Sequence, residues 1–155
     1  MFNTNKTANR PLLLSAIFLL SIAYSCSPKV DDTTAIKQLL EKESATWRSG
    51  DIQAHANCWL IRPYSRILIS TADGKMIDVP PENMLNPPAN STGKGGSSVN
   101  SNYKIHIDGD NAWVSHNEVS TAKDSTKSYT AEIRILEKNN GQWKLVGQSI
   151  HVYKP

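Results

Sequence analysis

The chain has 155 residues, of which 39% are hydrophobic, and a formal net charge of +3. The first 25 residues hold two cations and no acid, which leaves 15 Lys and Arg against 14 Asp and Glu in residues 26–155. This near-neutral balance gives no electrostatic reason to expect nucleic acid as a partner. The length after residue 25 suits one domain with a modest hydrophobic core.

The N-terminal segment predicts export from the cytoplasm. Lys6 and Arg10 precede a largely apolar run from Leu12 to Ala23. A run of this length is too short to span about 30 Å of hydrocarbon as a helix, and it suits the core of a signal peptide. We therefore expect residues 1–25 to be a targeting segment outside the folded domain.

The end of this segment bears on anchoring. Ala23-Tyr24-Ser25-Cys26 resembles the end of a bacterial lipoprotein signal, in which cleavage precedes a cysteine that becomes lipidated. The resemblance implies a lipid anchor on Cys26 and an extracytoplasmic protein, on the periplasmic side of a bacterial membrane or at the cell surface. Residues 26–32 would form a tether, and residues 33–155 the domain. An ordinary secretory signal cleaved near Ser25 is the alternative.

Two helices are predicted at the start of the domain. An apolar stripe at helical spacing predicts the first over residues 34–48. Its members are Ile36, Leu39, Leu40, Glu43 and Trp47. Gly50 ends this helix, and Asp51 caps a second, short helix that runs to about Cys58. Glu43 lies within the stripe, where a carboxylate needs a partner or a wet cavity unless it is displaced to the solvated edge of the helix.

A strand pair and a long loop follow. Residues 65–71 and the segment that ends at Val79 predict two strands around a turn at 72–75. Residues 80–100 contain four Pro and three Gly, and they predict a loop with one helical turn at 81–85. Long loops in compact domains are often lids or binding loops.

Three hairpin turns between Tyr103 and Tyr153 predict an antiparallel sheet. Residues 108–111 and 139–141 favour tight turns because Gly and Asn tolerate positive φ, whereas residues 123–125 form a looser polar turn. Side chains then alternate between two faces of the sheet. A one-residue slip in any hairpin would exchange the two faces of that strand.

This register separates a polar surface from an apolar one. Polar side chains gather on the face that also carries Leu136 and Leu145; they are Tyr103, His116, Glu118, Glu132, Arg134, Ser149 and His151. The opposite face is apolar and includes Trp113, Ile133, Ile135, Val146, Ile150 and Val152. An apolar patch of this kind needs a partner wherever it is exposed.

The sequence holds no strong metal motif. His116, Glu118 and His151 are neighbours in this register, but the chain lacks HxH or HExxH spacing. We therefore expect neither a metal nor a cofactor.

The order of these elements resembles the nuclear transport factor 2-like (NTF2-like) superfamily, and most closely its polyketide-cyclase-like (SnoaL-like) branch. The resemblance rests on Trp47-Arg48-Ser49-Gly50-Asp51 at the end of the first helix and on residues 140–146 at the start of the last strand. It implies an α+β fold in which a cone-shaped, curved antiparallel sheet wraps a long N-terminal helix and leaves a pocket. It also implies that the apolar face lies outside, where many members form dimers, so we expect a homodimer. Its interface would use Trp113, Ile133, Ile135, Val146 and Ile150.

One spacing within the resemblance concerns the pocket. In the association domain of calmodulin-dependent kinases, which belongs to this superfamily, an Arg nine residues before the equivalent Trp faces the pocket. Arg134 stands nine residues before Trp143. The resemblance therefore implies that Arg134 faces the pocket. We expect its neighbours there to be Tyr103, His116, Glu132, Ser149, His151 and Glu43.

Three functions remain open on this sequence. The first is a non-catalytic, membrane-anchored domain that binds a small anionic or carbonyl-bearing ligand beside Arg134. The second, implied by isomerases and cyclases of the superfamily, is an enzyme that transfers a proton next to a carbonyl, with Glu132 or His116 as the base. The third is a protein-interaction module. A mutually neutralised network, with Arg134 paired to Glu132 or Glu43, would be purely structural.

Overall fold

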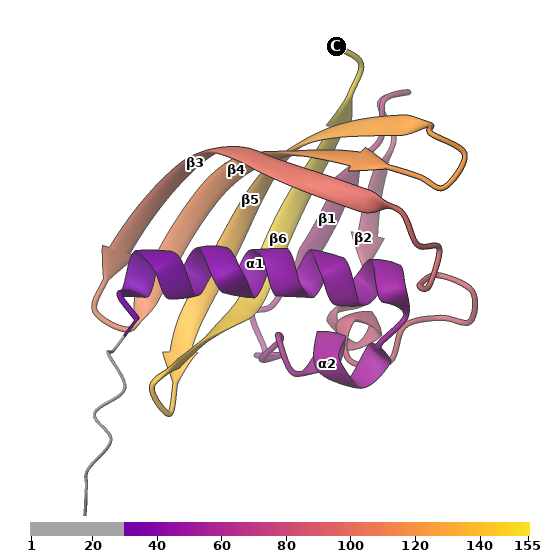
Figure 1. The fold of residues 1–155 in the computed structure, drawn as a ribbon. Helices are drawn as coiled ribbons and strands as arrows, with labels where there is room; N and C mark the ends of the chain where they lie inside the picture. The colour runs from indigo at the N-terminus through magenta and orange to yellow at the C-terminus, as the bar shows by residue number, and fades with distance from the viewer. Residues whose placement is uncertain (1–29) are drawn as a thin grey trace, which may run out of the picture.

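Helix α1 (Asp32–Ser49) crosses one face of a curved six-stranded sheet in the computed structural model, which describes residues 30–155 (Figure 1). The side chain of Asp31 starts the helix by accepting a hydrogen bond from the backbone N–H of Thr34 at 3.0 Å. Gly50 ends it with a φ of +78°, in the left-handed region that favours glycine. The predicted signal peptide and Cys26, the predicted lipidation site, lie outside the described residues.

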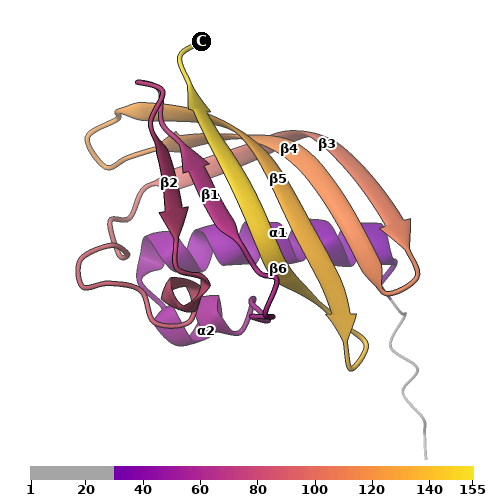
Figure 2. The same cartoon turned by 180° about the vertical axis from the view of Figure 1, so that it is seen from behind.

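The remaining elements follow the predicted order. They are α2 (Ile52–Ala56), β1 (Ile67–Ser70), β2 (Met76–Val79), η1 (Pro81–Met84), β3 (Ser97–Asp108), β4 (Asn111–Thr121), β5 (Lys127–Asn139) and β6 (Gln142–Tyr153). The sheet order is β2-β1-β6-β5-β4-β3, so the four long strands form a meander with β1 and β2 added beside β6 (Figure 2). The predicted α+β class is confirmed, although β3 begins inside the region predicted as loop and β1 pairs with β6 in parallel.

The register between β4 and β5 is the predicted one. Val114 lies opposite Arg134, and His116 lies opposite Glu132. The turn at residues 123–125 therefore holds its register, with Ser125 at a φ of +68°. The cross-strand pair of His116 and Glu132 that this hairpin was expected to create is present.

The register between β5 and β6 shifts by one residue. Leu136 faces Leu145 as predicted, but Ile135 faces Gly147, so Val146 is an extra residue in β6. Beyond this bulge every side chain of β6 changes face. Gln148 and Ile150 therefore turn toward α1, and the prediction that Ser149 and His151 line the inner face is wrong.

A second bulge lies in β3, between Ser101 and Lys104. Asn102 adopts a φ of +55° there, and Tyr103 stacks on His116 with ring centroids 5.2 Å apart. Tyr103 thus stays on the inner side of the sheet, where the Nζ of Lys37 on α1 lies 5.2 Å from its ring centroid.

The hydrophobic core fills the space between α1 and the sheet. It comprises Ile36, Leu40, Cys58, Trp59, Ile67, Met84, Ala112, Val114, Leu136, Trp143 and Leu145. Burial raises the pKa of the Cys58 thiol to about 11, in keeping with the role of a small core residue. Among residues 30–155, no helix is long and apolar enough to cross a bilayer.

The outer face of the sheet keeps only part of the predicted apolar surface. Trp113 and Ile135 are 43% and 49% exposed, as the alternation requires. Val146 is buried at the bulge, and Ile150 faces inward, so the placement of these two residues on the outer surface is wrong.

Candidate functional site

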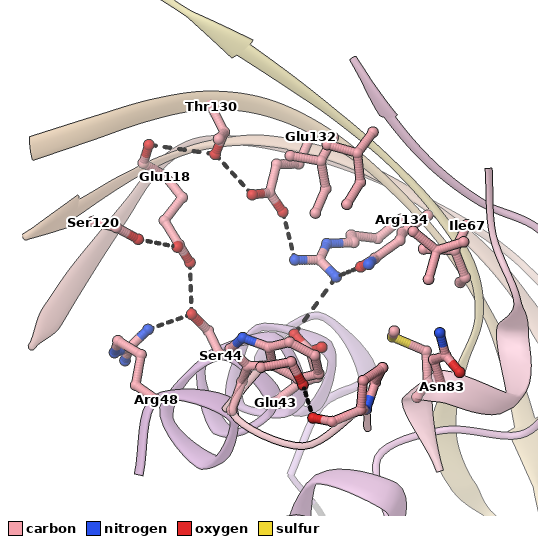
Figure 3. A pocket seen from close by; sticks show the side chains of 18 residues that line it. Glu43, Ser44, Arg48, Ile67, Asn83, Glu118, Ser120, Thr130, Glu132 and Arg134 are labelled. Carbon is pink, nitrogen blue, oxygen red and sulfur yellow. Dashed lines mark hydrogen bonds and ion pairs between the residues drawn. The ribbon is translucent and has the colours of Figure 1, made fainter. Parts of the chain in front are cut away.

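A cavity of about 440 Å³ lies beside the C-terminal half of α1 (Figure 3). Its walls come from α1, from β1, β2 and η1, from the loop after η1, and from the inner face of β4, β5 and β6. The apolar part of the lining is Trp47, Ile67, Ile69, Val79, Met84, Pro88 and Ile150. A volume of this size suits a small organic ligand. Arg134 is among the residues that line the cavity.

Arg134 forms the centre of a buried charge network. Its Nη2 pairs with Glu132, and its Nη1 donates to Gln148 and lies 3.5 Å from Oε2 of Glu43. Burial acts to lower the pKa of Arg134, but the neighbouring carboxylates outweigh it and raise that pKa. Arg134 therefore keeps its charge and is already neutralised within the protein.

Glu132 is held in its ionised form. Burial acts to raise the pKa of its carboxyl, but Arg134 and the hydroxyl of Thr130, which donates to Oε1 at 2.7 Å, together lower it. A carboxylate with a lowered pKa is a weak proton acceptor at neutral pH. Glu132 faces the cavity, as predicted, but its surroundings favour an ion pair over a general base.

His116 lies behind this network and does not line the cavity. Its Nε2 is 3.6 Å from Oε2 of Glu132, and its side chain is buried under Tyr103. Burial and then Arg134 lower the pKa of the imidazole, so His116 is neutral at pH 7. Burial also raises the pKa of Tyr103 to about 12. Neither residue contacts the space beside Arg134.

The predicted pocket residues thus divide into two groups. Glu43, Glu132 and Arg134 meet at the cavity. Tyr103, His116 and His151 border a second groove, together with Ser115 and Asn117 of the outer face. Glu132 lines this groove as well as the cavity. Ser149 contacts the imidazole of His151 at 3.0 Å on the outer side.

A second polar cluster, centred on Glu118, was missed as part of the site. Oε2 of Glu118 accepts from Ser44 at 2.7 Å, and Oε1 accepts from Ser120 at 2.6 Å. Arg48 donates to the hydroxyl of Ser44. The sequence could have indicated Glu118, because the alternation of side chains along β4 places it on the same face as His116. Gln148 could not be found in this way, because the bulge at Val146 has no signature in the sequence.

His55 is a further buried group without a sequence signal. Its Nε2 lies 3.7 Å from Oε1 of Glu43, and its ring lies between those of Trp47 and Trp59. Glu43, which the sequence placed either in a paired site or at a solvated edge, is therefore buried and contacted from two sides.

The loop after η1 closes the cavity at the end of α1. Its backbone N–H groups at Gly93 and Gly95 donate to the carbonyl oxygens of Trp47 and Arg48 at 3.0 and 2.8 Å. These bonds satisfy acceptors that a helix end leaves free. They also hold Pro88 and Ser91 of the same loop against the cavity.

The donor set of the site does not resemble a metal centre. Among the described residues, no group of three or more His, Cys, Asp or Glu side chains is arranged to hold a metal ion. The cavity carboxylates instead contact guanidinium and hydroxyl groups. The arrangement can bind polar atoms of a ligand at two points, Arg134 with Glu132 on one side and Glu118 on the other.

Comparison with known protein families and with curated proteins finds no match. Solved structures do match. An NTF2-like protein from Cytophaga hutchinsonii has a TM-score of 0.61 at 20% identity, over 79% of this chain and 99% of that one. The fold is NTF2-like. An NTF2-like protein of unknown function from Methylobacillus flagellatus gives a TM-score of 0.56 at 21% identity, over 81% of this chain and 95% of that one.

A third similar structure, from Exiguobacterium sibiricum, is a putative calcium/calmodulin-dependent kinase II association domain. It has a TM-score of 0.58 at 12% identity and covers 83% of this chain and 98% of that one. At these identities the likeness establishes the NTF2-like fold alone. Function has to be argued from the site.

Proposed function

We propose that the protein is a lipid-anchored, extracytoplasmic domain that binds a small ligand in the cavity beside Arg134 and does not transform it. The observation that carries this proposal is a cavity with an apolar wall on one side and a buried polar network on the other. Such a combination is typical of ligand sites, where apolar surface supplies affinity and a few fixed polar groups supply orientation.

The ion pairs that Arg134 already makes restrict the chemical class of the ligand. Its guanidinium already contacts Glu132 and Glu43, so an anionic ligand would compete with two buried carboxylates. A neutral carbonyl oxygen needs one hydrogen-bond donor and displaces no charge. Of the two ligand types expected from the sequence, the carbonyl-bearing one fits this network better.

The alternative is a small isomerase or cyclase that transfers a proton next to a carbonyl. Glu132 is the candidate base that faces the cavity, and the SnoaL-like resemblance favours such chemistry. The lowered pKa of Glu132 argues against it, as does the position of His116 behind Glu132 and outside the cavity lining. Turnover of an enolisable ketone that disappears in Glu132→Gln, while ligand binding survives, would favour the enzyme.

The binding proposal is tested by filling the cavity. Ile150 lines it and Ile135 lies on the outer face, so Ile150→Trp and Ile135→Trp place the same bulk inside and outside the site. A library of small carbonyl compounds is screened by thermal shift. We expect compounds that stabilise the wild type and Ile135→Trp but not Ile150→Trp. A screen in which no compound stabilises the wild type, or in which Ile150→Trp responds equally, would reject the proposal.

The anchor and the oligomeric state belong to the same proposal. The apolar run and Cys26 support lipidation, which mass spectrometry of the mature N-terminus tests, since an unmodified Cys26 would contradict it. Exposed Trp113 and Ile135 support a homodimer through the outer face. A protein-interaction module remains the other use of that face, and it predicts partner binding that survives filling of the cavity.

A further inference from the structure

Glu118 is a cavity carboxylate without a cationic partner. Both of its oxygens accept hydrogen bonds, but the donors are the neutral hydroxyls of Ser44 and Ser120. Within residues 30–155, no ion pair reaches it, in contrast to Glu43 and Glu132. A carboxylate can accept about four hydrogen bonds, so Glu118 retains acceptor capacity toward the cavity that it lines.

The charges that line the cavity leave it negative. Three carboxylates and two guanidinium groups face it, which gives a formal charge of −1. They are Glu43, Glu118, Glu132, Arg48 and Arg134. The carboxylates outweigh the effect of burial on Arg134, whose pKa they raise. A positive charge that enters this space is therefore stabilised, and a negative one is not.

Arg48, the cation nearest to Glu118 among the residues that line the cavity, does not contact its carboxylate directly. Its Nη1 donates to the hydroxyl of Ser44, which in turn donates to Glu118, so one hydroxyl separates the two charges. Figure 3 shows Arg48 and Glu118 each joined to Ser44 by a dashed line, with Arg134 on the far side of the cavity. Trp47 lines the same space and offers an aromatic surface, on which cations bind favourably.

From this arrangement we infer that Glu118 binds a protonated amine of the ligand. The inference rests on the proposed binding function and specifies its ligand class: a small amine with an apolar or aromatic body and a neutral oxygen at its other end. The amine would donate charge-assisted hydrogen bonds to Glu118, and the oxygen would lie toward Arg134. The apolar body would contact Ile67, Ile69 and Ile150 between the two polar ends.

Three probes that share one bicyclic ring test this ligand class. They are 2-naphthylmethylamine, 2-acetonaphthone and 2-naphthoate, which carry a cationic, a neutral and an anionic group. Their dissociation constants are measured by calorimetry with the wild-type protein, with Glu118→Gln and with Glu118→Asp. Glu41→Gln is the matched control, because it removes one carboxylate from an exposed position of α1.

We expect the wild type to bind the amine most tightly. Glu118→Gln keeps the shape and loses the charge, so it should weaken amine binding at least about tenfold and leave the ketone unaffected. Glu118→Asp retains the charge and should retain the preference for the amine, as should Glu41→Gln. This rescue separates the charge of Glu118 from any structural role, and the melting temperature without probe reports the fold of each variant.

The remaining outcomes distinguish the two proposals. If none of the probes binds, the amine ligand class is refuted, while the binding function is decided separately by the screen of carbonyl compounds. If the ketone or the naphthoate binds as tightly as the amine, the cavity binds ligands but the amine inference is wrong. If the amine is preferred and Glu118→Gln binds it equally well, the role of Glu118 is refuted.

Discussion

Arg134 and Glu132 form an ion pair that is buried on both sides, with side chains 5% and 4% exposed. The two residues stand two positions apart on β5, so both side chains point to the inner face of the sheet. Glu43 approaches the same guanidinium from α1. The network therefore joins the helix to the sheet at the wall of the cavity, and it links stability to the binding site.

Removing Arg134 should cost more stability than removing an exposed arginine. Arg134→Met leaves two buried carboxylates without their cation, for which we expect a loss of about 3 to 5 kcal/mol in the free energy of unfolding. Urea titration measures it. The control is Arg66→Met, which breaks a largely exposed pair with Asp78 and should cost about 1 kcal/mol or less. Equal losses in the two variants would contradict a buried network at Arg134.

The free energy of unfolding should fall as the pH is lowered, and His116 should contribute to this pH dependence. Its folded pKa lies below the ordinary value of 6.5, so below about pH 6.5 the unfolded chain binds a proton that the folded protein does not. Stability therefore rises with pH in the window between the folded pKa and 6.5. Glu132 has the same sign at lower pH, because its stabilisation is lost as the pH falls from 4.5 through its lowered folded pKa.

His116→Asn tests this assignment. We expect the curve of unfolding free energy against pH to be flatter than that of the wild type below pH 6.5. Above that pH the two curves should run parallel, because His116 is neutral in both the folded and the unfolded states. Urea titrations at several pH values measure both slopes. Curves that stay parallel throughout would show that His116 is not the group responsible.

The sequence predicts correctly which side chains of β4 and β5 lie on the inner face, but it does not do so for β6. Period-two alternation placed Arg134, Glu132 and His116 correctly, because the single hairpin turn between β4 and β5 sets their register. The extra residue at Val146 reversed the rest of β6, which removed Ser149 and His151 from the site and brought in Gln148 and Ile150. A bulge depends on pairing with both neighbouring strands, here β5 and β1, and local sequence does not encode it.

Contacts between distant segments were equally hidden from the sequence. Ser44 and Glu118 are 74 positions apart and meet only because the sheet curves over α1. The sequence left Glu43 either buried and paired or solvated at the helix edge. Glu43 is buried because Arg134 and His55 contact it from two sides, and both are distant from it in sequence.

The proposed homodimer predicts that a charge on the outer face changes the oligomeric state. Trp113 is 43% exposed in the middle of that face, and Trp113→Lys should give a monomer, because an interface core rarely accommodates an unpaired charge. Light scattering at micromolar concentration measures the mass. Met76→Lys, at an exposed position on β2, is the control and should remain dimeric. A monomeric wild type would reject the dimer.

Gly50 should couple the end of α1 to the loop that closes the cavity. A Cβ at Gly50 would lie 3.0 Å from Cα of Gly93, so Gly50→Ala has to displace the loop and also adopt a φ of +78°. Gly74→Ala is the matched control, because Gly74 has a φ of +84° and nothing within 4 Å of its added Cβ. The free energy of unfolding of the control should therefore fall only by the cost of the strained backbone, about 1 kcal/mol or slightly more.

The difference between these two variants measures the contact of the loop with the helix. Gly50→Ala should unfold at a lower urea concentration than Gly74→Ala, because it also weakens the hydrogen bonds from Gly93 and Gly95 to the end of α1. It should bind cavity ligands less tightly as well, since the same loop presents Pro88 and Ser91 to the cavity. Equal unfolding midpoints and unchanged affinity would mean that the loop contributes neither to the stability of the helix end nor to the closure of the site.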